Sequence, residues 1–330
     1  MGDILKKKVI ILFGGNTSEH LISCKSAKSI LENIDKNIYD VIPVVISKDN
    51  LWYLYESDYS LVESWEEQKL SKIENIISFL KNVDVVFPII HGNTGEDGKL
   101  QGLFELFDIK YVGSDVLTNA ICMDKDYTKT ILESYGIPTA PYITINKKDY
   151  DKNIIINFEY PVIVKPSSSG SSIGINVVDD YNELNKYIEY AFNYSDKVIV
   201  EKFINARELE CAILITNNDI HISTIGEIKY FSRFYDYDAK YVNDSELIIP
   251  STINEDVVNR IREYIKKICN VLNIKGLSRI DFLYEEDTDK IYLIEINTLP
   301  GFTTISMYPK LLNYDGITYK EILSKLIDNV

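Results

Sequence analysis

The chain has 330 residues, of which 45% are hydrophobic and 26% charged, and its formal net charge is −15. This composition is typical of a globular protein with a substantial core divided into two or three domains. The acidic excess disfavours broad nucleic-acid binding, because a phosphate backbone would be repelled. No apolar run approaches the length of a membrane span, and the first residues lack the pattern of a secretory signal. We therefore expect a cytoplasmic protein that binds neither nucleic acid nor membrane.

The cysteines and histidines give no sign of a disulfide framework or a zinc site. Only three histidines occur, and the four cysteines lie far apart in apolar surroundings: Cys24, Cys122, Cys211 and Cys269. Neither set shows metal-ligand spacing, and a disulfide scaffold is unusual in a chain of this length.

The N-terminal third alternates between strand and helix patterns. Val9–Phe13 is a continuous apolar run, as in strands buried in a parallel sheet, and further strands are predicted at about 40–46 and 83–90. A helical pattern lies between the first two, carried by Ile22, Ala27, Ile30 and Leu31. This is an open α/β layout, in which ligands bind where strands end.

The turn from Gly14 to Glu19 follows the first strand. It lacks the G-x-G-x-x-G spacing of a dinucleotide-binding turn, and no acidic residue ends the second strand to hold a ribose. Two interpretations of Glu19 stay open. It either binds an ammonium group at the start of a helix, or it is a favourable first-turn acid behind a Ser18 cap.

A second turn, from His91 to Gly98, follows another buried strand. Its three glycines allow the backbone to wrap closely around a small molecule. His91 is a candidate ligand contact, although a single histidine more often has a structural role.

Pro138 and Pro141 mark a boundary near residue 140. Beyond it, a Ser/Gly loop (166–174) separates strands predicted at 162–165 and 198–202. Backbone amides of this loop and Lys165 could hold a phosphate, although the order is not that of a P-loop; the alternative is a flexible linker. Three further residues are weaker candidates for anchoring a purine and a ribose: Glu201, Lys202 and Glu208.

The C-terminal part contains a functional loop, a helix and a hairpin. The segment 229–244 is aromatic and polar without periodicity, which is typical of a functional loop. A helix is predicted at 256–273 from a single apolar stripe: Val257, Ile261, Ile265, Ile268 and Leu272.

The hairpin predicted over 279–297 carries the most informative chemistry. Its turn is the acidic stretch 285–289, and folding that turn symmetrically places Asp281 opposite Glu295 and Arg279 opposite Asn297 on one face. The other face then pairs apolar residues, namely Ile280 with Ile296 and Phe282 with Ile294. Two carboxylates, an amide and an arginine together suit Mg²⁺ held with nucleotide phosphates, and the alternative is a solvated outer face.

Taken in order, these segments resemble those of the D-alanine–D-alanine ligases of the ATP-grasp superfamily over nearly the whole chain. The resemblance rests on the turns at 14–19 and 91–102, Met123-Asp124-Lys125, the loop from Val164 to Gly174, Glu201-Lys202, 235–241, Arg279-x-Asp281 and the segment 295–301. It implies an α/β ATP-grasp fold. An N-terminal open parallel α/β domain (1–122) would precede two α+β subdomains that clasp ATP (123–212 and 213–330), with a lid at 229–245.

The resemblance also implies a reaction. The carboxylate of one D-alanine would attack the γ-phosphate of ATP to give an acyl phosphate. The amine of a second D-alanine would then displace phosphate, yielding D-alanyl-D-alanine for peptidoglycan precursors. The implied cofactors are ATP and two Mg²⁺ ions, with Mn²⁺ as a substitute, and the implied assembly is a homodimer.

The resemblance assigns roles to individual residues. The metal ligands would be Asp281, Glu295 and Asn297. The ATP contacts would be Lys125, Lys165 and Lys240 at the phosphates and Glu201, Lys202 and Glu208 at the adenine and ribose. Glu19 and His91 would bind the first D-alanine, Arg279 and Gly301 the oxyanion, and Ser306 with the backbone of Met307 the second carboxylate. Ser171 and Tyr241 would join Glu19 in a hydrogen-bonded set, so that the catalytic group is Glu19, Ser171, Tyr241, Arg279 and Ser306.

The chain differs from the family pattern at two positions, and other functions remain as alternatives. His20 and Leu21 stand where family members carry more polar residues, which we expect to affect positioning only. Tyr241 and the apolar Met307 favour D-alanine as second substrate, and a D-alanine–D-serine or D-lactate ligase of the glycopeptide-resistance type is the alternative. A nucleotide-binding regulator without catalysis and a nicotinamide oxidoreductase fit less well, the first because the candidate site residues are retained.

Overall fold

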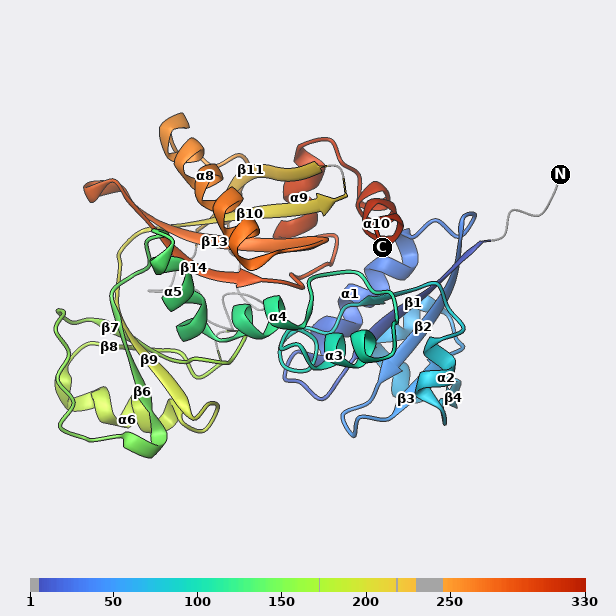
Figure 1. Cartoon of the computed structure of the whole chain (residues 1–330), viewed down its shortest axis with the longest axis horizontal. Helices are drawn as coiled ribbons and strands as arrows, with labels where there is room; N and C mark the ends of the chain where they lie inside the picture. Colours follow the sequence, from blue (N-terminus) through green and yellow to red (C-terminus); the bar gives the residue numbers. More distant parts are fainter. Residues whose placement is uncertain (1–5, 172, 218, 230–245) are drawn as a thin grey trace.

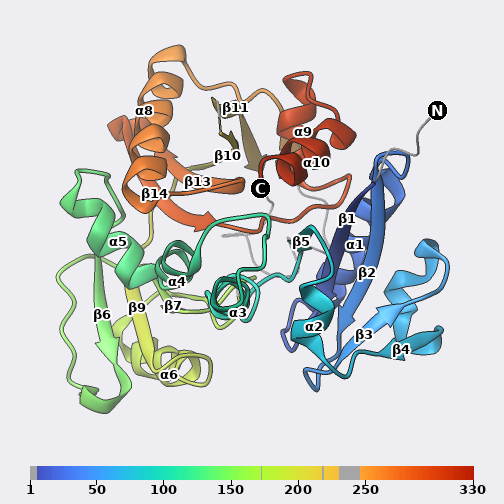
Figure 2. The same cartoon turned by 45° about the vertical axis from the view of Figure 1, so that its right-hand side comes forward.

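A computed structural model describes residues 6–171, 173–217, 219–229 and 246–330. Its strands form three sheets, with a five-stranded sheet near the N-terminus, a four-stranded sheet in the middle of the chain and a five-stranded sheet near the C-terminus (Figure 1). The turned view in Figure 2 separates the three, with the N-terminal sheet coloured blue to teal, the middle sheet green to yellow, and the C-terminal sheet yellow to orange-red.

The N-terminal sheet has the strand order β4-β3-β2-β1-β5. Its parallel part contains β1 (Lys7–Gly14), β2 (Tyr39–Ile46) and β5 (Val85–Pro88). These are the strands that the apolar runs predicted, and every residue from Val9 to Phe13 is buried. The sequence did not predict two short antiparallel edge strands, β3 (Trp52–Tyr55) and β4 (Leu70–Lys72), so the sheet is mixed rather than purely parallel.

Helices cover both faces of this sheet. On one face, α1 (His20–Asn33) and the C-terminal helix α10 (Tyr319–Asp328) bury apolar side chains against Ile11 and Phe13. On the other face, α2 (Ile76–Leu80) and α3 (Lys99–Leu106) pack against Ile10 and Leu12. The alternation of neighbouring β1 residues between two apolar clusters is what a strand buried on both faces requires.

The middle sheet has the order β6-β9-β7-β8 and is antiparallel throughout. Its strands are β6 (Tyr142–Asn146), β7 (Val162–Pro166), β8 (Asn176–Val178) and β9 (Lys197–Lys202). Helix α6 (Tyr181–Ala191) packs Leu184 and Ile188 against the valines of one face. The chain enters this region through α4 (Val116–Met123) and α5 (Lys125–Ser134).

The C-terminal sheet has the order β12-β11-β10-β13-β14. Its strands are β10 (Arg207–Thr216), β11 (Asp219–Lys229), β12 (Glu246–Ile248), β13 (Leu277–Glu285) and β14 (Lys290–Asn297). The predicted helix is α8 (Glu255–Leu272), and all five residues of its apolar stripe are buried against this sheet. Helix α9 (Met307–Tyr314) packs against β10 and β11 through a separate cluster that α10 shares. Three short 3-10 helices complete the described elements: η1 (Tyr59–Glu67), η2 (Lys147–Asp149) and η3 (Glu286–Thr288).

The hairpin β13–β14 reproduces part of the predicted register. Arg279 pairs with Asn297, Ile280 with Ile296 and Asp281 with Glu295, as expected. The fourth expected pair, Phe282 with Ile294, is wrong, because a bulge shifts the register and Phe282 faces Leu293. A bulge adds a residue to one strand, which a symmetric folding of the turn cannot anticipate. It lies beyond Asp281, so the pairs closer to the open end of the hairpin keep their register.

Strand pairing also bears on the division of the chain. The boundary expected between 212 and 213 falls inside β10, which pairs with β11 and β13 along its length. We therefore propose that the C-terminal subdomain begins between Lys202 and Arg207, where β9 of the middle sheet ends and β10 begins.

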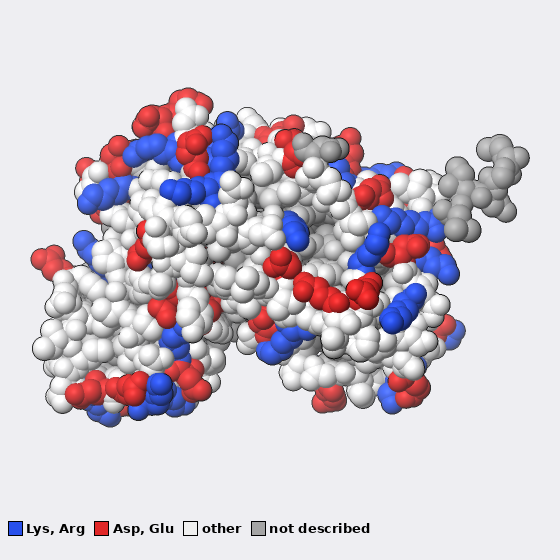
Figure 3. All heavy atoms as spheres, viewed as in Figure 1, with Lys and Arg blue, Asp and Glu red and all other residues white. Residues whose placement is uncertain are grey.

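The surface carries charge of both signs. Acidic and basic side chains are interspersed over the face drawn in Figure 3, without a dominant patch of either sign. Among the helices that the structure describes, none combines the length and the apolar character needed to cross a bilayer.

Candidate active site

The residues singled out by the sequence converge from all three sheets. Glu19 comes from the N-terminal lobe, Ser171 from the Ser/Gly loop of the middle sheet, and Glu295 from the C-terminal hairpin. The hydroxyl of Ser171 donates a hydrogen bond to Oε1 of Glu19, and Nζ of Lys125 lies 3.7 Å from Oε2 of Glu295 while it donates to the carbonyl of Ser169 at 2.7 Å. Segments more than 100 residues apart therefore meet at one place.

The open end of the β13–β14 hairpin carries the predicted charged face. Arg279 binds both oxygens of Asp281, from Nε to Oδ1 at 2.8 Å and from Nη2 to Oδ2 at 2.7 Å, and the side-chain amide of Asn297 donates to Oδ2 at 3.0 Å. Glu210 on β10 pairs with Asp281 across the sheet and lies 3.2 Å from Nε of Arg279. Three carboxylates from adjacent strands, those of Glu210, Asp281 and Glu295, thus share one face with a single guanidinium.

The charge of Arg279 is fixed by these neighbours. Burial alone would lower its pKa, but Asp281 and Glu210 outweigh burial and hold the pKa well above the ordinary value for arginine. A guanidinium that stays charged in a buried, acidic site can bind an anion that develops during a reaction.

Glu19 sits at the N-terminus of α1, where its own side chain is only 8% exposed. Of the two interpretations left open for Glu19, the one with a Ser18 cap is wrong, because Glu19 itself occupies the cap position. Oγ1 of Thr17 accepts from the Glu19 amide at 2.8 Å. Two glycines make room for the carboxylate. A Cβ on Gly92 would lie 2.5 Å from Oε2 of Glu19, and one on Gly170 would lie 3.0 Å from it. A buried carboxylate enclosed by backbone in this way suits an ammonium ligand.

His91 is buried and both of its ring nitrogens have protein partners. Nδ1 lies 2.9 Å from the carbonyl of Leu299, and Nε2 lies 2.9 Å from Oγ of Ser26. Burial lowers the pKa of His91, so the ring is neutral at neutral pH. A carbonyl only accepts, which makes Nδ1 the donor and Nε2 the acceptor from Ser26. In this conformation His91 therefore positions the loop 91–98 rather than offering a ring nitrogen to a ligand.

Glu96 in the same loop was missed by the sequence analysis. Its Oε2 accepts from the Gly92 amide at 2.7 Å and its Oε1 from the Leu299 amide at 3.0 Å. Desolvation and the charge of Glu19 raise its pKa to about 8. The sequence shows Glu96 within a glycine-rich turn, but its hydrogen bond with the Leu299 amide depends on the tertiary fold.

The middle sheet gathers the candidate nucleotide residues. Lys165 on β7 and Glu201 on β9 are buried, and Nζ of Lys165 lies 2.7 Å from Oε2 of Glu201. Lys129 on α5, also missed by the sequence analysis, approaches the same oxygen at 3.0 Å. Lys129 follows Lys125 by four residues, so helical spacing alone could have placed both on one face. Lys202 and Glu208 are half-buried at the ends of β9 and β10.

The base of α9 holds the residues expected near the second substrate. Ser306 is the cap residue, and its Oγ bonds to Oγ1 of Thr303 at 2.7 Å beside Gly301. Met307 is buried, and its side chain packs close to Gly226 on β11. Its apolar character therefore reflects core packing, which weakens the expectation that this side chain selects the substrate. Lys240, Tyr241 and most of the expected lid lie outside the described residues.

Comparison with known proteins places this geometry in a family. A model described as "D-ala D-ala ligase N-terminus" matches residues 8–114, and one described as "D-ala D-ala ligase C-terminus" matches residues 131–328. The chain belongs to the D-alanine–D-alanine ligase family. It is an ATP-dependent ligase with the ATP-grasp fold of that family.

Similar proteins cover the chain almost completely. A D-alanine–D-alanine ligase of Acetivibrio thermocellus is 44% identical over 99% of this chain and 96% of its own length, and one of Clostridium novyi is 44% identical over 98% of both. Among solved structures, the VanG D-Ala:D-Ser ligase from Enterococcus faecalis has a TM-score of 0.89 and 36% identity over 98% of this chain and 99% of that one. The D-alanine–D-alanine ligase from Coxiella burnetii has a TM-score of 0.85 and 30% identity over 98% and 93%.

The donor chemistry of the hairpin is compatible with the Mg²⁺ ions that the family resemblance implies. Asp281, Glu295 and Asn297 supply oxygen atoms, which hard divalent cations prefer. As the side chains stand, Arg279 and Lys125 provide the positive charge beside these carboxylates. Within the described residues, no group of three or more His, Cys, Asp or Glu side chains is arranged to hold a metal ion, and this face supplies two carboxylates and an amide.

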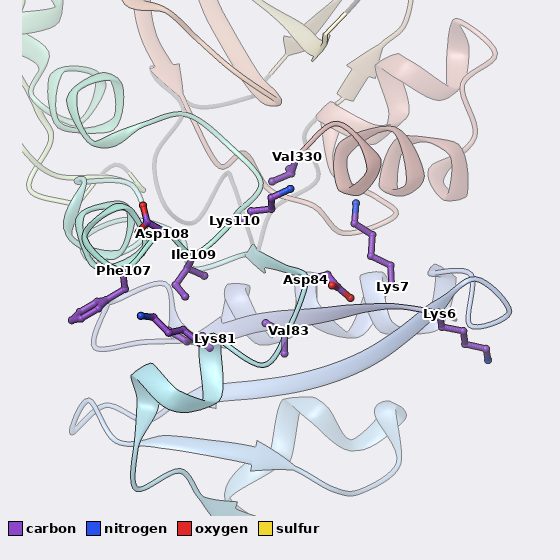
Figure 4. Close-up of a pocket in the computed structure, with 11 residues that line it drawn as sticks. Lys6, Lys7, Lys81, Val83, Asp84, Phe107, Asp108, Ile109, Lys110 and Val330 are labelled. Carbon is purple, nitrogen blue, oxygen red and sulfur yellow. The ribbon is translucent and has the colours of Figure 1, made fainter. Parts of the chain in front are cut away.

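A separate cavity of about 750 Å³ lies at the opposite end of the N-terminal sheet (Figure 4). Lys7, Lys81 and Lys110 line it together with Asp84, Asp108 and the C-terminal residue Val330. Part of this charge is already compensated, since Nζ of Lys7 lies 3.6 Å from Asp328 and Asp84 accepts from the Lys8 amide. The residues assigned to the ligase reaction lie elsewhere.

Proposed function

We propose that the chain joins two D-alanine molecules into D-alanyl-D-alanine for peptidoglycan precursors, with conversion of ATP to ADP and phosphate. The observation that carries the proposal is the meeting of Glu19, Ser171 and the Asp281–Glu295 face across three sheets. This arrangement offers a buried carboxylate for an ammonium group, donors for phosphate and a guanidinium for a developing oxyanion. Those are the groups that acyl-phosphate chemistry between two amino acids needs.

These residues would have separate roles in the two steps of the reaction. Glu19, held by Ser171, would bind the ammonium group of the first D-alanine and so present its carboxylate to the γ-phosphate. A bond forms from that carboxylate oxygen to phosphorus while the bond to ADP breaks. The amine of the second D-alanine then attacks the acyl carbon, and Arg279 with the Gly301 amide would stabilise the oxyanion until phosphate leaves.

Lysines and oxygen donors would hold the nucleotide. Lys125 and Lys165 would neutralise phosphate charge, together with Lys240, and Glu201, Lys202 and Glu208 would lie at the adenine and ribose. Asp281, Glu295 and Asn297 would hold Mg²⁺, which screens phosphate charge during phosphoryl transfer. Ser306 and the Met307 backbone would receive the second carboxylate, because they lie at the N-terminus of α9, and helix N-termini favour anions.

The deciding experiment is phosphate release from ATP and Mg²⁺ with D-alanine alone, with products identified by mass. Release that depends on D-alanine and yields the dipeptide supports the proposal. No release with any D-amino acid would overturn it and leave an ATP-dependent ligase with another substrate.

A second candidate is ligation of D-alanine to D-serine, since the VanG structure, titled a D-Ala:D-Ser ligase, superposes with a TM-score of 0.89. The same assay with D-alanine plus D-serine or D-lactate separates the two. Preferential formation of a mixed product over D-alanyl-D-alanine would favour the second candidate.

We also propose a cytoplasmic homodimer, on the family resemblance alone. Light scattering of the purified chain tests the assembly, and a mass equal to the 37.9 kDa monomer would contradict it.

A further inference from the structure

Lys129 has an unusual environment for a lysine. Its side chain is 1% exposed, on the face of α5 turned toward the middle sheet. Nζ lies 3.0 Å from Oε2 of Glu201 and 5.1 Å from the ring centre of Tyr142, which pairs with Glu201 across β6 and β9. Enclosing an ammonium group so completely is costly unless a fixed counterion compensates it.

One carboxylate oxygen of Glu201 lies close to the ammonium groups of two lysines. Lys165 and Lys129 approach Oε2 of Glu201 at 2.7 and 3.0 Å. Burial raises the pKa of Glu201, but the two lysines outweigh burial and keep it below its ordinary value. Two ammonium groups thus share one carboxylate oxygen in a buried site, with Glu133 as a further negative charge near Lys129. An anion that binds beside Lys165 would compete with Glu201 for that lysine.

The two lysines differ in what else they can reach. Lys165 is the last residue but one of β7, just before the Ser/Gly loop, whose Ser169 and Ser171 contact Lys125 and Glu19. Lys129 contacts Glu201 and the ring of Tyr142, both on the middle sheet. It lies on α5, which is anchored by the hydrogen bond from the Lys125 amide to the Ser167 carbonyl at 2.9 Å. Lys165 is therefore the cation that can change partners, and Lys129 the one that stays.

We infer that Lys129 is a positioning residue for the nucleotide: it remains the counterion of Glu201 when ATP binds, so that Lys165 is released to a phosphate. The inference rests on the proposed function, because it assumes that ATP binds beside Lys165. Without Lys129, Glu201 would keep Lys165 as its counterion. The phosphate would then have to draw Lys165 away from a buried ion pair.

The test is a double-mutant cycle on ATP affinity, measured by calorimetry with Mg²⁺ and without D-alanine. Lys129→Met should weaken ATP binding by about tenfold, a typical size for coupling between neighbouring charged sites. In the Glu201→Gln background the same substitution should change ATP affinity less than about twofold, because no carboxylate is left to retain Lys165. The KM for D-alanine should stay unchanged in the Lys129→Met variant.

The controls separate this role from a merely structural one. Lys186→Met removes a lysine from α6 whose side chain is 68% exposed and should bind ATP like the unaltered chain. Equal losses of affinity from Lys129→Met in both backgrounds would mean that Lys129 only fills space and would overturn the inference. If Lys129→Met does not fold, the comparison of Glu201→Gln with the double variant still decides, since a difference in ATP affinity above about twofold there contradicts the charge argument.

Failure of the proposed function gives a different result. An unaltered chain that binds no ATP would refute the proposed function and this inference with it. ATP binding that is indifferent to Lys129 would refute the inference alone.

Discussion

His91 connects two loops that lie about 200 residues apart in the chain. Through Nδ1 it holds the Leu299 carbonyl, and through Ser26 it reaches the Phe302 amide, to which Oγ of Ser26 lies at 3.3 Å. Glu96 adds a second connection to Leu299. The backbone around Gly301, expected at the oxyanion, is therefore positioned from the N-terminal lobe. The sequence singled out His91 as a candidate, but it could not predict the contacts with Leu299 and Ser26, because both are created by the tertiary fold.

Glu96 makes stability depend on pH. Its pKa is raised from 4.5 to about 8 by desolvation, so the folded chain holds a proton that the unfolded chain releases. The stabilisation is complete below pH 4.5 and is lost as the pH rises toward about 8. We expect the melting temperature of the unaltered chain to fall over this range relative to Glu96→Gln, which cannot ionise.

Thermal unfolding of both proteins between about pH 5 and pH 8 measures this difference. Glu263→Gln, at a side chain that is 71% exposed on α8, is the matched control and should track the unaltered chain. A constant offset between Glu96→Gln and the unaltered chain at every pH would contradict the prediction.

Gly92 is the point where backbone approaches the Glu19 carboxylate most closely. Its φ is +70°, and a Cβ would lie 2.5 Å from Oε2 of Glu19. Gly316 also has a positive φ of +89°, but a Cβ there meets nothing within 4 Å. Both glycine-to-alanine changes cost about 1 kcal/mol of backbone strain, and only Gly92→Ala should also displace Glu19.

Gly316→Ala therefore serves as the control for Gly92→Ala. We expect Gly316→Ala to keep full turnover, and Gly92→Ala to raise the KM for the first D-alanine or abolish turnover. Steady-state kinetics measure this, and equal kinetics of the two variants would show that the Glu19 contact is unimportant.

At the scale of elements, the hairpin β13–β14 shows which strand pairs a sequence pattern can predict and which it cannot. Alternation and an acidic turn were enough to place Asp281 opposite Glu295, because side-chain direction in a strand has a period of two. The same reasoning failed at Phe282, where a bulge changes the register. Glu210 was missed because its role depends on β10 lying beside β13, and the pairing of distant strands cannot be read from local periodicity.

The hairpin also predicts a metal-dependent phenotype. Glu295→Gln keeps the shape of the side chain but removes one of the carboxylate charges beside Asp281. We expect it to lower turnover by at least about a hundredfold, a size seen when transition-state charge stabilisation is removed, and to raise the Mg²⁺ concentration needed for half-maximal rate.

Phosphate release across a Mg²⁺ titration, with a melting curve as a check on folding, measures both effects. Glu263→Gln on α8 should leave the titration unchanged. A Glu295→Gln variant with normal turnover and normal Mg²⁺ dependence would mean that this face holds no ion.

At the scale of the whole molecule, apolar patterning predicted the parallel strands, the long helix α8 and two of the four middle strands, β7 and β9, since each buries a local stripe. It did not predict the antiparallel edge strands β3 and β4, which are short and only partly buried. Nor did it predict the position of β10, which follows the middle sheet in sequence yet belongs to the next one. Local sequence specifies an element, and its partner is decided by packing between distant segments.

The last helix completes the first sheet. Ile322, Leu323 and Leu326 of α10 belong to the same buried cluster as Val9 and Ile11 of β1, and the Lys7 ammonium group bonds to the Ile327 carbonyl at 2.7 Å. During synthesis the N-terminal sheet therefore leaves the ribosome long before the helix that covers it. Helix α1 can cover part of this apolar face early, but the part that packs against α10 stays exposed until α10 has been made, and exposed apolar surface of this kind is what chaperones bind on a nascent chain.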